Sequence, residues 1–296
     1  MAKGDSQKNG AIEIGGESVS PGERASIDVD LGRLYTHTPV TIPVQVINGR
    51  RKGPTLLVSA ALHGDELNGV EIIRRLVAMR TLNRLRGALI VVPVVNVHGL
   101  LTHSRYLPDR RDLNRSFPGS ETGSLARRVA RVFLDEIVKK CTHAIDLHTG
   151  AVHRYNLPQI RGDFGEDEGE TLAMAKAFGT PVLLDSNIRD GSLREAASDL
   201  GMPMLVYEGG EALRFDEISI RGGVRGIVNV MRSLGMLAAK KGRKKALLPL
   251  VARSSSWERA PSSGIFRSLR RSGDRVEKDK TLLGVIADPF GARETE

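Results

Sequence analysis

Two histidines and one glutamate at the ends of apolar runs are the side chains in this sequence best suited to chemistry. His63 and Glu66, in His63-Gly-Asp-Glu66, follow one apolar run, and His148 closes another within Asp146-Leu-His148-Thr-Gly150. Two imidazoles and one carboxylate form a three-ligand set for a catalytic Zn²⁺ that leaves one position open for water. The pattern predicts one Zn²⁺ per chain and a zinc hydrolase. The competing interpretation is that both histidines are merely hydrogen-bonded at strand ends.

Two further carboxylates are placed to assist such a metal. Asp146 lies two residues before His148, on the same side of a strand, where it could accept the distal N–H of a zinc histidine. Capping a neighbouring loop is the alternative role. Glu208, in Tyr207-Glu208-Gly-Gly-Glu211, follows another strand end and is predicted to be the general base. Glu211 is its rival, and both could instead cap a helix start.

A polar segment between two apolar elements, residues 98–120, is long enough to indicate a functional loop. Its Asn114 and Arg115 can grip a carboxylate, since the guanidinium offers a bidentate fork and the amide an extra donor. A second arginine near the metal could stabilise the oxyanion of the reaction. Arg105 is the preferred candidate, with Arg110 and Arg111 as rivals.

The elements that position these residues follow from hydrophobic periodicity. Strands are expected at 39–47, 55–62, 88–95, 142–148, 181–184 and 203–207, and helices at 66–79, 124–140, 170–178, 192–200 and 226–239. The prolines of 39–47 predict an edge strand there, and 50–54 is expected to be a turn. Alternating strands and helices predict an α/β fold with a mixed, mostly parallel sheet covered by helices. Ligands bind at the carboxyl ends of strands in such sheets.

The chain is expected to have a flexible N-terminus at 1–20, a catalytic domain at 21–242 and a small all-β domain at 243–296. Its 296 residues, 40% hydrophobic, contain no apolar run long enough for a membrane span, and no secretory signal is recognisable. Cys141 is the single cysteine, which excludes an intrachain disulfide and a cysteine zinc site. A cytoplasmic enzyme fits these features, and a homo-oligomer is compatible with them.

The net charge of +9 raises the question of nucleic acid. Basic runs at 240–245 and 267–271 lack interleaved aromatic residues, and no nucleic-acid motif accompanies them. They are interpreted as solvated linker and surface, so no nucleic-acid partner is expected. Attraction of an anionic substrate to a basic cleft is a milder possibility.

Four segments in this order resemble the succinylglutamate desuccinylase and aspartoacylase family, a branch of the zinc carboxypeptidase-like hydrolases. The matching strings are His63-Gly-Asp-Glu66, Asp112-Leu-Asn-Arg115 with Phe117-Pro-Gly119, Asp146-Leu-His-Thr-Gly150 and Tyr207-Glu208-Gly-Gly. The resemblance implies zinc binding by His63, Glu66 and His148, substrate binding by Asn114 and Arg115, and Glu208 as base. It also implies hydrolysis of the amide of a small anionic N-acyl amino acid.

The resemblance extends to the C-terminal region and leaves the substrate open. Residues 259–291 resemble half of a lipoyl-like β-sandwich without a lysine at its turn, so the small domain is expected to be shortened or incomplete. All four tyrosines lie before residue 208, so the C-terminal tyrosine with which aspartoacylase grips its substrate is absent. N-acetylaspartate and N-acyl diamino acids are therefore equally consistent. A zinc carboxypeptidase acting on peptides and a non-catalytic metal-binding module are the alternative functions.

Overall fold

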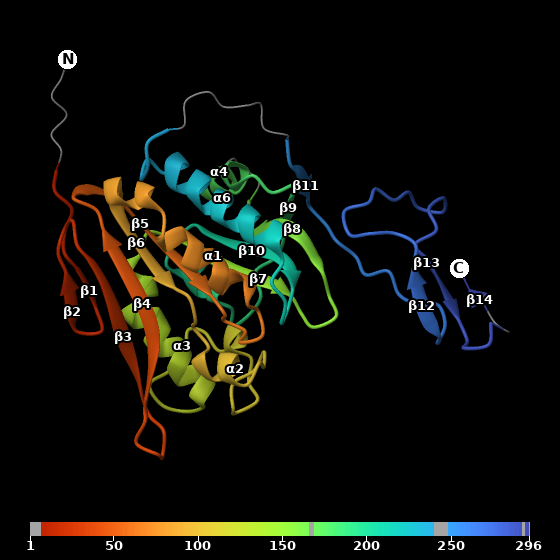
Figure 1. Ribbon diagram of the computed structural model, residues 1–296, viewed down its shortest axis with the longest axis horizontal. Helices are drawn as coiled ribbons and strands as arrows, with labels where there is room; N and C mark the ends of the chain where they lie inside the picture. The colour runs from red at the N-terminus through yellow and green to blue at the C-terminus, as the bar shows by residue number, and fades with distance from the viewer. Residues whose placement is uncertain (1–6, 166–168, 240–247, 292–293, 296) are drawn as a thin grey trace. The chain divides into compact units, whose positions relative to one another are not determined.

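The computed structural model describes residues 7–165, 169–239, 248–291 and 294–295, in two compact units, residues 1–253 and 254–296 (Figure 1). Residues 1–6, which were expected to be flexible, lie outside the described residues. So does the basic run at 240–245. In the part of the chain that is described, no helix is both long and apolar enough to cross a membrane.

A nine-stranded mixed sheet forms the frame of the larger unit, in the order β11-β9-β8-β10-β7-β5-β6-β4-β3. Its central strands β10, β7, β5 and β6 are parallel to one another, whereas β8, β4 and β3 each pair antiparallel with a neighbour. The strands are β3 (Arg24–Arg33), β4 (Pro39–Asn48), β5 (Arg51–Ala60), β6 (Arg86–Val92), β7 (His143–Gly150), β8 (Asn156–Gly162), β9 (Val182–Asp185), β10 (Met204–Glu211) and β11 (Leu250–Ala252).

Helices cover both faces of this sheet, and each face has its own apolar core. Residues of α1, α4 and α6 pack in one core, and residues of α3 and α5 pack in the other. The helices are α1 (Asn68–Val77), α2 (Val97–Leu101), α3 (Leu125–Glu136), α4 (Glu170–Phe178), α5 (Leu193–Asp199) and α6 (Glu217–Ser233), with 3₁₀ turns η1 (Arg80–Arg84), η2 (Leu113–Arg115) and η3 (Val138–Lys140). The predicted fold class, a mixed and mostly parallel sheet between helices, is confirmed.

The expectation that 39–47 is an edge strand is wrong. This segment is β4, which lies between β3 and β6. Its prolines are tolerated because pairing with β6 begins only at Gln45, so Pro39 and Pro43 lie where β4 has β3 as its one sheet neighbour. The turn expected at 50–54 is also shorter, since β5 begins at Arg51.

The last helix begins nine residues earlier than expected and ends earlier as well. Helix α6 starts after Asp216, whose carboxylate accepts a hydrogen bond from the Ser219 N–H as an N-cap. Its glycines weaken the helical signal in the sequence, yet they are needed for packing. A Cβ at Gly223 would lie 2.4 Å from Ile72, and one at Gly226 would lie 2.0 Å from Phe178.

The N-terminal segment differs from the flexible terminus expected over 1–20. Strands β1 (Ile12–Ile14) and β2 (Glu17–Val19) form an antiparallel hairpin, and Lys8 makes an isolated bridge with Arg51. Ile14 and Val19 are almost fully buried in the core on the α3 face. Burial of these two side chains anchors the hairpin.

The smaller unit contains a three-stranded antiparallel sheet of β12 (Ile265–Ser268), β13 (Gly284–Ala287) and β14 (Glu294–Thr295). The small C-terminal sheet predicted from the sequence is therefore present. The division between the units falls at 253, later than the expected 242, because β11 pairs with β9 and so belongs to the larger sheet.

Candidate metal site

Two parallel neighbours in the sheet bring the predicted metal ligands together. Strands β5 and β7 pair in parallel up to Ala60 and Leu147, so both end at the same edge of the sheet. His63 and Glu66 lie in the short connection from β5 to α1, and His148 lies near the end of β7. Gly64 is required in this connection, because a Cβ there would lie 1.9 Å from the backbone carbon of Gly99.

The three side chains converge in a buried group, with relative exposures of 3% for His63, 2% for Glu66 and 4% for His148. Glu66 Oε1 is 2.7 Å from His63 Nδ1, and its Oε2 is 2.8 Å from His148 Nδ1. One ligand atom from each residue lies within 4.8 Å of the others. Two imidazole nitrogens and a carboxylate at this spacing can hold a metal ion.

A carboxylate binds the outer nitrogen of each histidine. Asp146 Oδ2 is 2.6 Å from His148 Nε2, and its Oδ1 accepts a hydrogen bond from Ser59 Oγ at 2.7 Å. Asp112 Oδ1 is 3.1 Å from His63 Nε2. These contacts turn both Nδ1 atoms toward Glu66 and would fix the tautomer that a metal needs. The sequence pointed to Asp146 but missed Asp112, although it lies in the same string as Asn114 and Arg115.

The group carries more negative than positive charge when its histidines are neutral. Glu66, Asp112 and Asp146 supply three carboxylates, and Arg105 contacts two of them. Burial alone would lower the pKa of His148, but Asp146 and Glu66 raise it well above the ordinary value. Burial likewise opposes the charged form of Glu66, yet the two histidines hold its pKa well below the usual range. This donor set fits a divalent cation, which would balance the excess charge and keep the histidines neutral.

Arg105 is the arginine that reaches this group. Its Nη2 donates to Asp112 Oδ2 at 2.9 Å, and its Nη1 lies 3.2 Å from His63 Nδ1 and 3.4 Å from Glu66 Oε1. Arg110 and Arg111 are exposed. The guanidinium of Arg105 is thus placed beside any metal ion bound by the three ligands.

The Asn114-Arg115 pair lies in η2, in contact with the start of α5. Leu193 N–H donates to Asn114 Oδ1 at 2.9 Å, so the amide group turns its NH₂ side away from that backbone. Gly191 packs against Arg115, and Phe117 N–H donates to the Gly191 carbonyl at 3.0 Å. Arg115 is exposed, and its Nη1 donates to the Asn114 carbonyl oxygen.

Glu208 lies opposite His148 in the pairing of β10 with β7, so both residues occupy the same edge of the sheet. Its carboxylate accepts a hydrogen bond from Asn156 Nδ2 at 2.7 Å. Burial raises the pKa of Glu208, and the charges of His148 and Arg161 act in the opposite direction. The rival, Glu211, instead accepts a hydrogen bond from the His153 N–H and pairs with Arg214.

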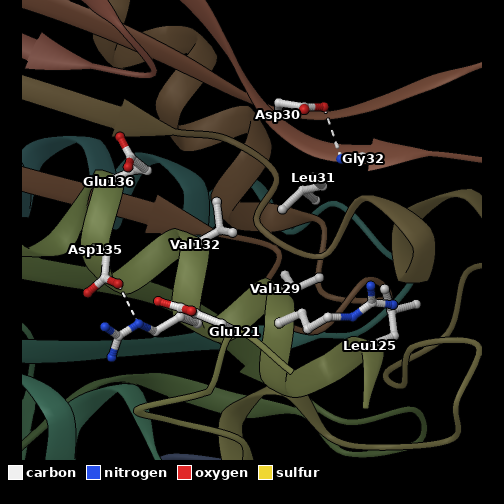
Figure 2. A pocket seen from close by; sticks show the side chains of 11 residues that line it. Asp30, Leu31, Gly32, Glu121, Leu125, Val129, Val132, Asp135 and Glu136 are labelled. Carbon is white, nitrogen blue, oxygen red and sulfur yellow. Dashed lines mark hydrogen bonds and ion pairs between the residues drawn. The ribbon is translucent and has the colours of Figure 1, made fainter. Parts of the chain in front are cut away.

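A surface cleft lies elsewhere, between β3 and α3 (Figure 2). It has a volume of about 370 Å³, and its walls include Leu31, Leu125, Val129 and Val132 with charged side chains around them. None of the predicted site residues lines it. The candidate metal site is therefore identified by converging buried polar groups rather than by the size of a hollow.

Comparison with known proteins places the chain in a family. Residues 52–234 match the succinylglutamate desuccinylase/aspartoacylase catalytic domain, and the chain belongs to this family. It is 34% identical over 149 residues to the N-alpha-acetyl-L-2,4-diaminobutyric acid deacetylase of Halomonas elongata. This match covers 49% of this chain and 43% of that protein. It is 30% identical over 139 residues to the succinylglutamate desuccinylase of Pseudomonas aeruginosa, and this second match covers 44% of this chain and 41% of that protein. The matches span less than half the length of these curated relatives.

Solved structures show the same architecture. A succinylglutamate desuccinylase/aspartoacylase from Rhodobacter sphaeroides has a TM-score of 0.77 and 26% identity, with 89% of this chain and 82% of that chain covered. The product-bound ectoine utilization protein EutE (DoeB) from Ruegeria pomeroyi has a TM-score of 0.78 and 24% identity, with 97% of this chain and 89% of that chain covered. The second comparison shows the fold alone.

Proposed function

We propose that this protein is a zinc-dependent deacylase that hydrolyses the amide bond of a small N-acyl amino acid. The observation that carries the proposal is the buried convergence of His63, Glu66 and His148 at the strand edge that also presents Glu208. Family membership supports it, and the two curated relatives are by name a deacetylase and a desuccinylase of N-acylated amino acids.

His63 and His148 through Nδ1, and Glu66 through its carboxylate, would hold the ion. A zinc ion there would supply the Lewis acidity that makes water nucleophilic near neutral pH. Glu208 accepts the proton of the attacking water and delivers it to the leaving amine. Arg105 donates hydrogen bonds to the oxyanion that forms at the acyl carbon.

The substrate is bound through a carboxylate by the Asn114 amide and the Arg115 guanidinium, in keeping with donors that match a planar carboxylate. The Asn114 amide is oriented for this role because its oxygen accepts from Leu193 N–H. Asp112 and Asp146 orient the two histidines.

A substrate panel with measured zinc content tests the proposal. Purified protein with zinc quantified per chain is assayed with N-acetyl-L-2,4-diaminobutyrate, N-succinyl-L-glutamate, N-acetyl-L-aspartate, N-formyl amino acids and a short peptide with a free C-terminus. Amine release from at least one N-acyl amino acid, without trimming of the peptide, is expected. Peptide trimming alone would identify a carboxypeptidase instead.

Glu208→Gln separates catalysis from metal binding. The amide keeps the size of the side chain but cannot accept a proton, so turnover should fall roughly a hundredfold or more while zinc content stays unchanged. Full turnover in this variant would exclude Glu208 as the base. If neither the wild type nor the variant turns over any substrate while both hold zinc, a non-catalytic metal-binding module is the better interpretation.

A further inference from the structure

Glu208 faces one hydrogen-bond donor and one positive charge from a strand that no sequence motif includes. Asn156 Nδ2 donates to Glu208 Oε2 at 2.7 Å, and Arg161 Nε lies 3.8 Å from Oε1. Both residues belong to β8. The two oxygens of the carboxylate therefore face different groups, and one of them is bound by a directional, neutral donor.

The backbone explains why Asn156 makes this contact. Glu208 pairs with His148 of β7 and Gln159 of β8, and the register of β10 shifts against both neighbours before its next pairing. Beyond the shift, Gly210 pairs with Asn156 and adopts a positive φ of 80°. Although Gln159 is the backbone partner of Glu208, the hydrogen bond to the carboxylate comes from Asn156.

Asn156 and Arg161 therefore act on Glu208 in different ways. At 3.8 Å the Arg161 nitrogen is beyond hydrogen-bond length, so it acts on Glu208 through charge alone. The Asn156 bond is short and fixes one oxygen, which restrains a terminal side-chain torsion that is otherwise broad. A general base needs one oxygen in a defined position for the proton it exchanges.

We propose that Asn156 is a positioning residue for Glu208, which binds Oε2, fixes the plane of the carboxylate and leaves the other oxygen to exchange the proton. The inference rests on the proposed function, because it assumes that Glu208 is the base. Asn156 acts through Glu208 and needs no contact with the substrate.

Asn156→Asp tests this role with almost no change in shape. The ionised carboxylate cannot donate to Glu208, so kcat should fall about tenfold or more near neutral pH, while KM stays within about twofold and zinc content is unchanged. A second carboxylate also raises the pKa of Glu208, so the acid limb of the kcat–pH profile should move to higher pH. The substrate is whichever of N-acetyl-L-2,4-diaminobutyrate and N-succinyl-L-glutamate the wild type hydrolyses faster.

Two further variants keep the test decisive. Asn156→Ala removes the donor without adding charge, so kcat should fall by a similar factor with a smaller shift of the acid limb. Gln159→Glu makes the same amide-to-carboxylate change on the same strand and should affect kcat much less. Equal losses in Gln159→Glu and Asn156→Asp would overturn the proposal, since charge alone would then explain both. So would wild-type kcat in both Asn156 variants, provided that thermal unfolding shows them folded.

The outcomes distinguish this inference from the proposed function. If Glu208→Gln lowers turnover and the Asn156 variants do not, the positioning role fails and the proposed function stands. If Glu208→Gln leaves turnover intact, the base assignment fails first and the role of Asn156 falls with it.

Discussion

Two regions of the larger unit are rich in charged side chains but use them differently. Asp135 lines the β3–α3 cleft (Figure 2) and pairs with Arg131 and Lys139, four residues away on either side along the chain. All three side chains are at least 29% exposed. At the candidate metal site, the contact of Glu66 with His148 joins residues 82 positions apart, and both side chains are at most 4% exposed.

This difference indicates which of the two regions is the better candidate for a functional site. Exposed ion pairs between residues four apart contribute little to the free energy of folding, and they occur commonly without any functional role. Burying several ionisable groups from distant segments costs free energy unless each is paired, so such clusters gather at functional sites. The β3–α3 cleft is consequently the weaker candidate for a functional site, and variants in the two regions should behave very differently.

The largest effect is expected for His148→Ala. If His148 is one of three zinc ligands, its loss should reduce bound zinc from about one per chain to near zero and abolish turnover. Zinc is measured by elemental analysis after dialysis, with His98→Ala in α2 as the matched control. Full zinc content in His148→Ala would show that these three residues do not form the metal site.

Arg105→Gln should affect turnover strongly with zinc retained. Loss of an oxyanion donor lowers kcat by about 10²–10³-fold in other enzymes. Arg110→Gln, an exposed neighbour on the same loop, should stay within about twofold of the wild type. A reversal of these two results would assign the oxyanion role to Arg110.

Asp146→Asn should lower the affinity for the metal rather than slow the chemical step. The amide is a poorer partner for His148 Nε2, and changes of this kind weaken metal affinity by about 10- to 100-fold. Competition with a chromogenic chelator measures the affinity, and Asp135→Asn on α3 is the control. Unchanged affinity would mean that Asp146 binds Ser59 and His148 without influencing metal binding.

The smallest effect is expected for Glu121→Gln in the β3–α3 cleft. Glu121 is exposed, and an exposed substitution of this kind changes the free energy of unfolding by at most about 0.5 kcal/mol. Turnover should stay within about twofold of the wild type. A large loss of activity would mean that the cleft takes part in function and that the contrast drawn above is wrong.

Hydrophobic periodicity predicted the regular parts of the fold well. The helix over 170–178 has the expected bounds, and Ser124 and Ser192 cap α3 and α5 at the expected starts. Predictions failed where local propensity was overridden by packing. The glycines of α6 weakened the helical pattern, so its first half was not predicted. The prolines of β4 indicated an edge strand, which its pairing with β6 contradicts. Strand β8, with Asn156, carried too mixed a pattern to be recognised.

The sequence by itself determined the family, the fold class and the residue types of the site, because strand-end motifs such as His63-Gly-Asp-Glu66 are local and depend on chain order. Only the tertiary structure decided which groups meet. Asp112 contacts His63, Asn156 contacts Glu208, and Arg105 rather than Arg110 reaches Glu66. These contacts depend on strand order and on a register shift in β10, which arise from long-range pairing and packing that no local pattern in the chain specifies.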